Sequence, residues 1–218
     1  NLSHDATTVL LRNPLFNSIQ KSGGYGFDPV MRGFKYDQLN IVLNGAQGAT
    51  AACPNRMDPP TSQLAPNMID KVEIIKGPYA LRYGTGLGAT INFISNPLLF
   101  STEKQFNGRV SSSYETNGNV KRTEAKVGHV SEFVNVNIFG AWSEGDDYLA
   151  GDDKTVQADF KRGSLGADLG LKLSKNQNLK LSAIRNFARD SDFPALAMDL
   201  RKDDTWLLNA DHNINFQN

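Results

Sequence analysis

Alternation of apolar and polar residues over long stretches is the feature that most constrains this chain of 218 residues. The clearest example runs from Leu165 to Ser174, with leucine or alanine at every odd position and Gly, Asp, Lys or Ser at every even one. A period of two places successive side chains on opposite faces of a β-strand. The sequence therefore predicts strands with one apolar face and one polar face.

Six strands of this kind are expected in the second half of the chain. Their predicted ranges are 106–116, 120–129, 133–143, 162–174, 178–188 and 204–216. Tight joins at 131–132 and 174–177 alternate with long ones at 144–160 and 189–203, although the first join, 116–119, is also short. In a soluble sandwich the apolar face would meet a second sheet, whereas in a membrane barrel it would meet lipid. Alternation alone does not separate these two folds.

Composition excludes several classes of function. Acidic and basic residues number 23 each and the basic residues are scattered, so a nucleic-acid-binding protein is not expected. No apolar run approaches the roughly 18 residues of a spanning helix. The single cysteine rules out an internal disulfide.

The first part of the chain, residues 1 to 98, is irregular and rich in Gly and Pro. Short strands are expected around 41–43, 72–75 and 89–94, and a short helix or turn over 10–19. Lys76-Gly77-Pro78 interrupts the block between the last two strands, since no helix or central strand continues through Gly-Pro. A glycine-dense turn at 84–88 follows.

The block from Ile69 to Ser95 resembles the end of the plug domain of TonB-dependent outer-membrane receptors. Met31-Arg32-Gly33-Phe34 and Ile41-Val42-Leu43-Asn44-Gly45 resemble two further plug signatures in the same order. The resemblance implies an all-β (mainly β) membrane protein, with a plug domain over 1–98 inside a transmembrane antiparallel β-barrel that begins within 99–218. Family members close twenty-two strands, so this chain would hold about six of them and be part of a longer polypeptide.

The resemblance also implies a place and partners. The protein would lie in the outer membrane of a Gram-negative bacterium, in contact with lipid, and would be driven by the TonB–ExbB–ExbD complex. Import by such a receptor involves no chemistry on the cargo, so no enzyme activity and no catalytic cofactor are expected. The glycines at 84, 86 and 88 lack the spacing of a dinucleotide-binding motif.

A candidate metal-binding motif lies within the first part. Cys53 and Met57 stand four positions apart in a loop stiffened by Pro54, Pro59 and Pro60. A thiolate and a thioether favour Cu(I) over harder cations. The spacing by itself is a weak signal, because Cys and Met more often serve in packing.

The wider loop, C-P-N-R-M-D-P-P-T-S, resembles the plug loop of outer-membrane copper receptors of the NosA/OprC type. In that group a barrel loop adds a His-x-Met pair. Met198 matches the methionine of the pair, but Leu196 stands at the histidine position. The resemblance therefore implies copper ligation by Cys53, Met57 and Met198, with Cu(I) favoured.

Other polar residues are assigned less specific roles. His4, His129 and His212 are expected on surfaces rather than at the metal, and the pairs Asp146-Asp147, Asp152-Asp153 and Asp203-Asp204 in solvated external loops. Lys76 and Arg82 could form salt bridges between plug and barrel wall.

The predicted function is import of copper, as an ion or a small complex, across the outer membrane. Two alternatives remain open. The same receptor type could carry a ferric siderophore, cobalamin or another cargo, with Cys53 and Met57 structural. A soluble β-rich binding module is the alternative from another class.

Overall fold

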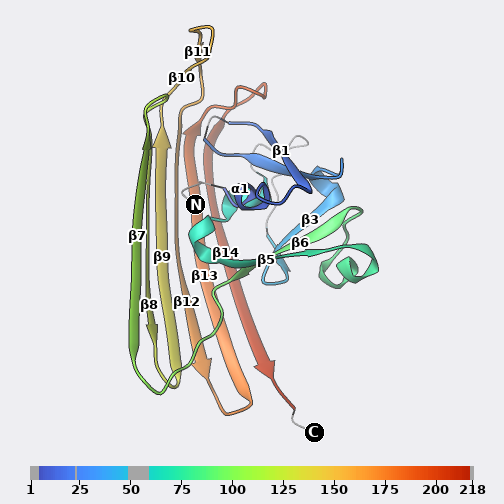
Figure 1. Cartoon of the computed structure of the whole chain (residues 1–218), viewed down its shortest axis with the longest axis vertical. Coiled ribbons are helices and arrows are strands. Elements are labelled where there is room, and N and C mark those ends of the chain that lie inside the picture. Colours follow the sequence, from blue (N-terminus) through green and yellow to red (C-terminus); the bar gives the residue numbers. More distant parts are fainter. Residues whose placement is uncertain (1–4, 23, 49–58, 217–218) are drawn as a thin grey trace.

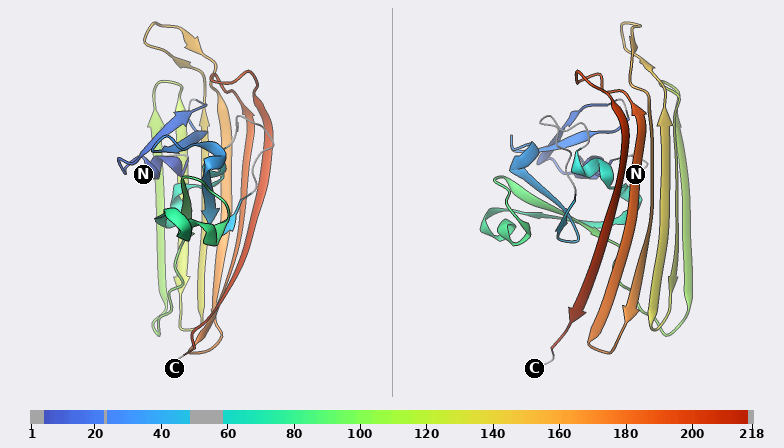
Figure 2. Two further views of the ribbon diagram at one scale, coloured as in Figure 1. Left: turned by 90° about the vertical axis from the view of Figure 1, so that its right-hand side faces the viewer. Right: turned by 180° about the vertical axis from the view of Figure 1, so that it is seen from behind.

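The computed structural model describes residues 5–22, 24–48 and 59–216, which form two parts in contact with each other (Figure 1). The larger part is a six-stranded sheet in the order β14-β13-β12-β9-β8-β7, in which every neighbouring pair is antiparallel. The smaller part packs against one face of this sheet, called the inner face below (Figure 2). None of the described helices is long and apolar enough to cross a membrane.

The six long strands confirm the prediction from alternation, with bounds that differ by a few residues. They are β7 (Gln105–Glu115), β8 (Val120–Val130), β9 (Val134–Gly145), β12 (Phe160–Lys172), β13 (Gln177–Ser191) and β14 (Leu200–Ile214). The connection between β9 and β12 contains a hairpin that the pattern did not predict, formed by β10 (Tyr148–Leu149) and β11 (Thr155–Val156). The long connections gather at the upper end of the sheet in Figure 1.

The two faces of the sheet have the predicted polarity. Leu165 is 60% exposed on the outer face, whereas Asp168 is 1% exposed on the inner face and accepts a hydrogen bond of 2.6 Å from Ser182 Oγ. Leu173, which has the parity of Leu165, is also exposed. Alternation therefore presents apolar side chains outward and polar ones toward the smaller part.

The smaller part is built around a four-stranded sheet in the order β4-β3-β6-β5, with β3 and β6 parallel. Its strands are β3 (Leu39–Leu43), β4 (Ala46–Gln47), β5 (Ile69–Ile75) and β6 (Ala89–Ser95). Asn44 and Gly45 join β3 to β4 with φ of 51° and 81°. Two consecutive left-handed residues form the hairpin turn that Asn-Gly favours, so this dipeptide sets the register of β4.

The predicted break after β5 is confirmed. Gly77 has a φ of 70° and begins a 3₁₀ helix, Gly77–Tyr83, which ends at Gly84 with a φ of 116°. Both glycines adopt a backbone conformation that other residues rarely reach. A Cβ on Gly88 would lie 2.6 Å from the Phe34 ring, so the glycine-dense turn also lets Phe34 pack closely on it.

The expectation of a helix or turn over 10–19 was wrong in its bounds. The helix α1 is only one turn long (Thr7–Leu10), and residues 16–20 form β1 (Phe16–Gln20), which pairs with β2 (Phe27–Met31). Pro14 follows the helix and cannot donate a backbone hydrogen bond, which stops the helix from continuing. Three further 3₁₀ helices are Tyr36–Gln38, Pro60–Gln63 and Pro66–Met68.

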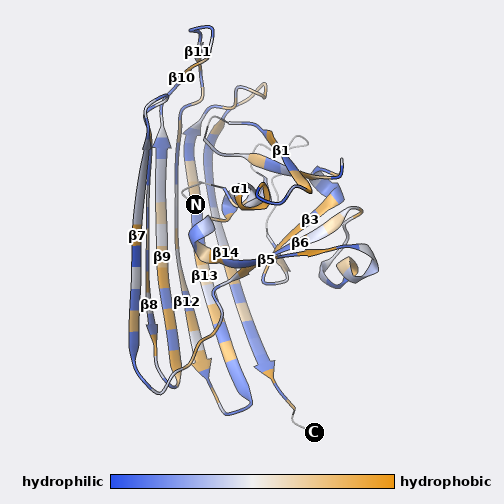
Figure 3. Cartoon of the chain, viewed as in Figure 1, coloured by the Kyte–Doolittle hydropathy of each residue, from blue (hydrophilic) through white to orange (hydrophobic). Residues whose placement is uncertain are grey.

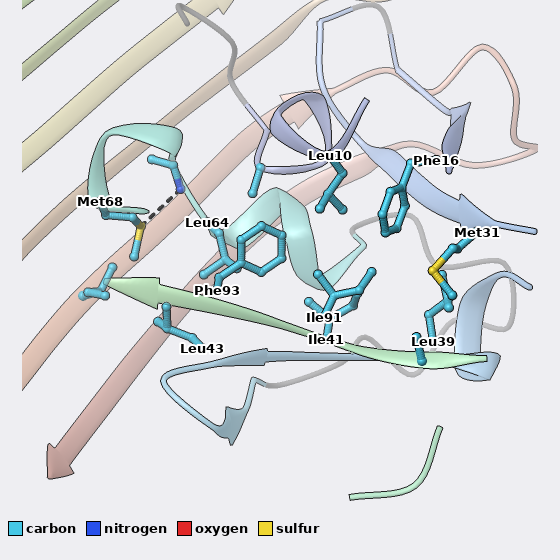
Figure 4. Packing of buried hydrophobic residues seen from close by; sticks show 14 of the residues in the cluster. Leu10, Phe16, Met31, Leu39, Ile41, Leu43, Leu64, Met68, Ile91 and Phe93 are labelled. Atoms are coloured by element: carbon cyan, nitrogen blue, oxygen red, sulfur yellow. Dashed lines mark hydrogen bonds between the residues drawn. The ribbon is translucent and has the colours of Figure 1, made fainter. Parts of the chain in front are cut away.

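An apolar core holds the smaller part together (Figure 4). Ile91 and Phe93 of β6 are fully buried at its centre, and the Met68 sulfur accepts a hydrogen bond of 3.2 Å from the Ala65 amide. Phe139 of β9 and Ile184 of β13 reach into the same core from the long sheet. Burial of each such side chain contributes about 1.5–3 kcal/mol. These two residues of the long sheet, here also called the wall, therefore help to anchor the smaller part.

Candidate functional site

Of the three predicted sulfur ligands, only Met198 lies among the residues that the structure describes. Cys53 and Met57 lie in 49–58, outside the described residues. Met198 lies in the loop 192–199 between β13 and β14, at the upper end of the sheet, and is 52% exposed. A site formed by these three residues therefore stays a prediction.

The chain immediately after 49–58 contacts the wall close to that loop. Gln63 Nε2 of the 3₁₀ helix Pro60–Gln63 donates to Thr205 Oγ1 of β14 over 3.4 Å. Ser62 lines a cavity of about 10 Å³ together with Leu200 and Asp203 of the same strand. The chain that follows the Cys53–Met57 segment therefore lies beside the first residues of β14.

The loop 192–199 is held down by an aromatic cluster. Phe193 is buried, with its ring 5.8 Å from the Tyr25 ring in an edge-on arrangement, and Tyr25 in turn packs against Phe160. Leu196 packs on this cluster, and its amide donates to the Phe193 carbonyl over 2.8 Å. Leu196 thus fixes the loop by apolar contact, while Met198 stays accessible.

Neither described histidine can complete a site with Met198. His129 lies on the outer face with its ring 4.4 Å from the Phe106 ring, and His212 pairs with Leu179 near the lower end of β13. Leu179 and Ser191 are twelve residues apart on one strand, which corresponds to about 40 Å. Throughout 5–22, 24–48 and 59–216, no group of three His, Cys, Asp or Glu side chains is arranged to hold a metal ion. His4 lies outside the described residues.

Acidic residues gather at the upper rim of the sheet. Asp159, Asp190, Asp192 and Asp199 line a cavity of about 170 Å³ with Arg201. Burial raises the pKa of Asp192, and the nearby carboxylates of Asp199 and Asp147 raise it further. The pKa of Asp159 is raised by burial and by Asp192. The sequence did not single out this group, because its members are distant in the chain and meet only through the hairpin pairing.

The predicted acidic pairs behave differently from one another. Asp146 accepts from Asn119 Nδ2 over 2.9 Å, and Asp147 accepts from the Ala158 amide over 3.0 Å, so both stabilise the connection between β9 and β12. Asp152 pairs with Lys154 in the exposed tip. The expected loop position of Asp203-Asp204 was wrong, since both lie on β14 and point to opposite faces.

Polar contacts join the smaller part to the wall near the end of β6. Lys180 Nζ donates to Ser95 Oγ over 2.7 Å, and Lys126 Nζ donates to Asn96 Oδ1. Asn96 Nδ2 reaches Asp168 Oδ2 at 3.4 Å. Lys76 precedes the 3₁₀ helix Gly77–Tyr83 and Arg82 lies within it; this helix extends away from the long sheet (Figure 1), and no ion pair among the described residues joins either side chain to these six strands. Salt bridges from Lys76 and Arg82 to other parts of a barrel wall stay a prediction.

Comparisons with known proteins agree with this architecture. Residues 2–90 match the model of the TonB-dependent receptor plug domain. The solved structure of the copper transporter OprC superposes with a TM-score of 0.81 and 27% identity, over 94% of this chain and 32% of that one. No curated protein sequence matches the chain.

Two iron-uptake receptors share the fold at lower identity. The ferric enterobactin receptor PfeA (mutant G324V) from Pseudomonas aeruginosa matches with a TM-score of 0.69 and 16% identity, over 98% of this chain and 36% of that one. The FrpB iron transporter from Neisseria meningitidis matches with 0.71 and 18%, over 87% and 30%. This chain spans about a third of the length of these structures. Residues 2–90 are similar to the plug domain of TonB-dependent receptors, and the chain has the fold of such a plug against part of a barrel.

Proposed function

We propose that this chain is part of a TonB-dependent outer-membrane receptor that imports copper, as an ion or a small complex. The observation that carries the proposal is the pairing of Cys53 and Met57 in a proline-rich plug loop. The chain that holds this loop is 27% identical to a copper transporter over 94% of the length of this chain. A thiolate with a thioether is a soft donor set, and soft donors select Cu(I).

The described flanks of the loop support a shared site between plug and wall. Gln63 contacts Thr205 of β14, and β14 begins directly after the loop that carries Met198. A copper ion held by Cys53 and Met57 would then meet Met198 from the wall side. Since Leu196 offers no imidazole, the all-sulfur set would hold Cu(I) better than Cu(II).

The outer face of the sheet supports placement in a membrane. Outward side chains between the rows of Gly163 and Leu173 are mainly apolar, and hydrophobic bands recur along the lower parts of β7 and β9 (Figure 3). Ten residues span about 33 Å at 3.3 Å each, which a tilt of about 40° reduces to about 25 Å, the height of a barrel's apolar band. On this reading residues 1–98 are the plug and 99–218 the first part of the barrel.

Transport by this receptor would require the plug to move, not the cargo to react. Partners would be the TonB–ExbB–ExbD complex and outer-membrane lipid. The plug consists of short strands and 3₁₀ helices, and much of its contact with the wall is polar. Short elements open at lower free energy than long paired strands do, which suits remodelling by a pulling partner.

Metal content of the full-length protein tests the assignment. Cys53→Ala is expected to abolish retention of Cu(I), because the thiolate supplies the charge and the strongest soft-donor bond. Met57→Ala should weaken retention strongly, and Met198→Ala by a smaller or equal amount. Leu196→His should increase retention of Cu(II) more than that of Cu(I), since imidazole binds both states.

The control is Met31→Leu, which removes a thioether from the buried core at a cost of under about 1.5 kcal/mol. Each variant is loaded under reducing and oxidising conditions and its copper measured by mass spectrometry. An unchanged copper content in Cys53→Ala would contradict the copper assignment. The alternative would then be a receptor for a siderophore, cobalamin or another cargo.

A further inference from the structure

Cationic side chains of four strands, β8, β12, β13 and β14, form a row across the outer face near the upper ends of these strands. The register aligns Lys121 of β8, Glu144 of β9, Lys161 of β12, Arg189 of β13 and Lys202 of β14. Arg162 and Ala188, the neighbours of opposite parity, are buried on the inner face. The row therefore points away from the plug and cannot take part in cargo binding inside the barrel.

A row of aromatic side chains lies one step below the cationic row. Trp142 and Phe187 both oppose Gly163, so they share an outward level, and their rings lie 5.9 Å apart. Trp206 follows one level lower, and aliphatic side chains continue from there. Aromatic rows of this kind mark the boundary between apolar lipid and headgroups in membrane barrels. The cationic row thus stands at headgroup height.

Part of the charge in this region is already paired. Arg185 donates two hydrogen bonds to the Asp204 carboxylate, at 2.9 and 2.7 Å, and Arg189 adds a third at 3.3 Å. These contacts lift the Arg185 guanidinium from the level of Trp206 toward the row. The row, together with Arg185 and Asp204, has five cationic side chains and two anionic ones, Glu144 and Asp204. Its net charge is therefore +3.

Two lysines of the row have no such partner. Lys161 and Lys202 are exposed, and the described residues offer neither of them an ion pair. They flank Arg189 on either side, since each is its register partner on the adjacent strand. The acidic cavity lined by Asp159, Asp190, Asp192 and Asp199 lies at the rim above them. Asp159 of this cavity lies close enough to Lys161 to interact with it electrostatically, but it forms no ion pair with it.

The long connections lie at the same end of the sheet as this row, and in membrane barrels the long loops face outward. We infer that this row, centred on Lys161, Arg189 and Lys202, binds the phosphate groups of a lipid headgroup in the outer leaflet. Neighbouring strands lie about 4.8 Å apart, so three cations in register span roughly 10 Å, enough to contact the phosphates of one doubly phosphorylated headgroup. Clustered Lys and Arg at the membrane surface attract anionic lipid in this way. The inference rests on the membrane placement proposed above but not on copper as the cargo.

Lipid binding to the full-length protein in detergent tests the inference. The probe is lipid A, with its two phosphates, measured by native mass spectrometry beside monophosphoryl lipid A and inorganic phosphate. The double variant Lys161→Gln, Lys202→Gln is expected to bind lipid A about 25-fold more weakly, since each surface lysine is worth about fivefold. Monophosphoryl lipid A should bind more weakly than lipid A. Millimolar inorganic phosphate should displace little of the bound lipid A.

The matched control is Lys104→Gln, Lys175→Gln, which removes two exposed lysines near the lower end of the sheet. It should bind lipid A as the wild type does. Equal binding by the Lys161/Lys202 variant, equal loss in the control, or full displacement by inorganic phosphate would each overturn the inference. Insertion into liposomes is measured in parallel: failure there would count against the membrane placement itself, whereas normal insertion with unchanged lipid binding refutes this inference alone. Copper content is expected to be the same in both variants.

Discussion

The long sheet and the plug are stabilised in different ways. In the sheet, neighbouring strands pair along nearly their whole length, for example through twelve residue pairs between β12 and β13. In the plug, the strands that form the central sheet have two to seven residues and depend on one apolar core. Only a few wall residues, chiefly Phe139 and Ile184, enter that core.

Polar contacts join the two parts beside the apolar ones that Tyr25, Phe139 and Ile184 make. Lys180 binds Ser95, Asn67 Nδ2 donates to the Gly140 carbonyl over 3.0 Å, and Asn135 Nδ2 donates to the Leu99 carbonyl over 3.0 Å. A typical hydrogen bond adds only about 0.5–1.5 kcal/mol net. The plug can therefore loosen from the wall, or within itself, while the backbone ladder of the sheet persists. This difference would suit the import path proposed above.

The largest effect is expected from emptying the plug core. Phe93 is fully buried, and Phe93→Ala should destabilise the plug by about 3–5 kcal/mol, because a cavity replaces the ring. Limited proteolysis of the full-length protein should then cut the plug much faster, with the sheet fragments surviving. Simultaneous loss of both parts would show that they unfold as one unit and would remove the distinction.

The next effect concerns the outer face of the sheet. Leu169→Arg should reduce stability in a bilayer by about 2–4 kcal/mol, because the charge would lie near mid-membrane. Leu165→Arg, at the level next to the aromatic row, should cost less because it lies nearer the interface. Equilibrium unfolding from lipid vesicles gives both values. An equal cost at both positions would contradict the assigned depth.

The contact between plug and wall is tested by Lys180→Met. The substitution keeps most of the side-chain length but removes the donor to Ser95 Oγ and the cation beside the inward Asp168. An unpaired buried group costs about 1–3 kcal/mol. Hydrogen exchange in β6 should accelerate while that in β12 and β13 stays unchanged. Lys175→Met, in the lower turn, is the control and should change neither.

Sequence reasoning succeeded best where one residue's neighbours determine its environment. The alternation at Leu165–Leu173 identified both the strand and its apolar outer face, since a period of two needs no knowledge of distant residues. Lys76-Gly77-Pro78 likewise marked a break from its own residues, and Gly77 has a φ of 70°. The register that aligns Lys161, Arg189 and Lys202 could not be obtained in this way, because it depends on which strands pair and at what offset.

The plug and the rim were predicted less well for the same reason. Residues 16–20 have mixed apolar spacing, and only pairing with β2 makes them a strand. Leu196 looked like a departure from a ligand position, whereas its packing on the cluster of Phe193 and Tyr25 becomes visible only in three dimensions. Met198 lies in a loop as predicted, whereas copper ligation by Met198, Cys53 and Met57 stays a prediction.

The smallest expected effect is a pH dependence at the rim. Burial and neighbouring carboxylates raise the pKa of Asp192 in the folded protein, so the folded state binds more protons there than the unfolded state does. Stability of this loop should therefore rise as pH falls through the folded pKa, and the gain should be complete below the unfolded value of about 3.9. Asp192→Asn should remove part of this dependence and protect the loop at pH 7.

The measurement is hydrogen exchange of the Phe193 amide, corrected for its intrinsic pH dependence. The control is Asp152→Asn in the exposed tip, because Lys154 lowers the pKa of the Asp152 carboxyl. A loop that is less protected at pH 4 than at pH 7 in the wild type would mean that the rim carboxylates stabilise the loop in their charged form, which would contradict the raised pKa.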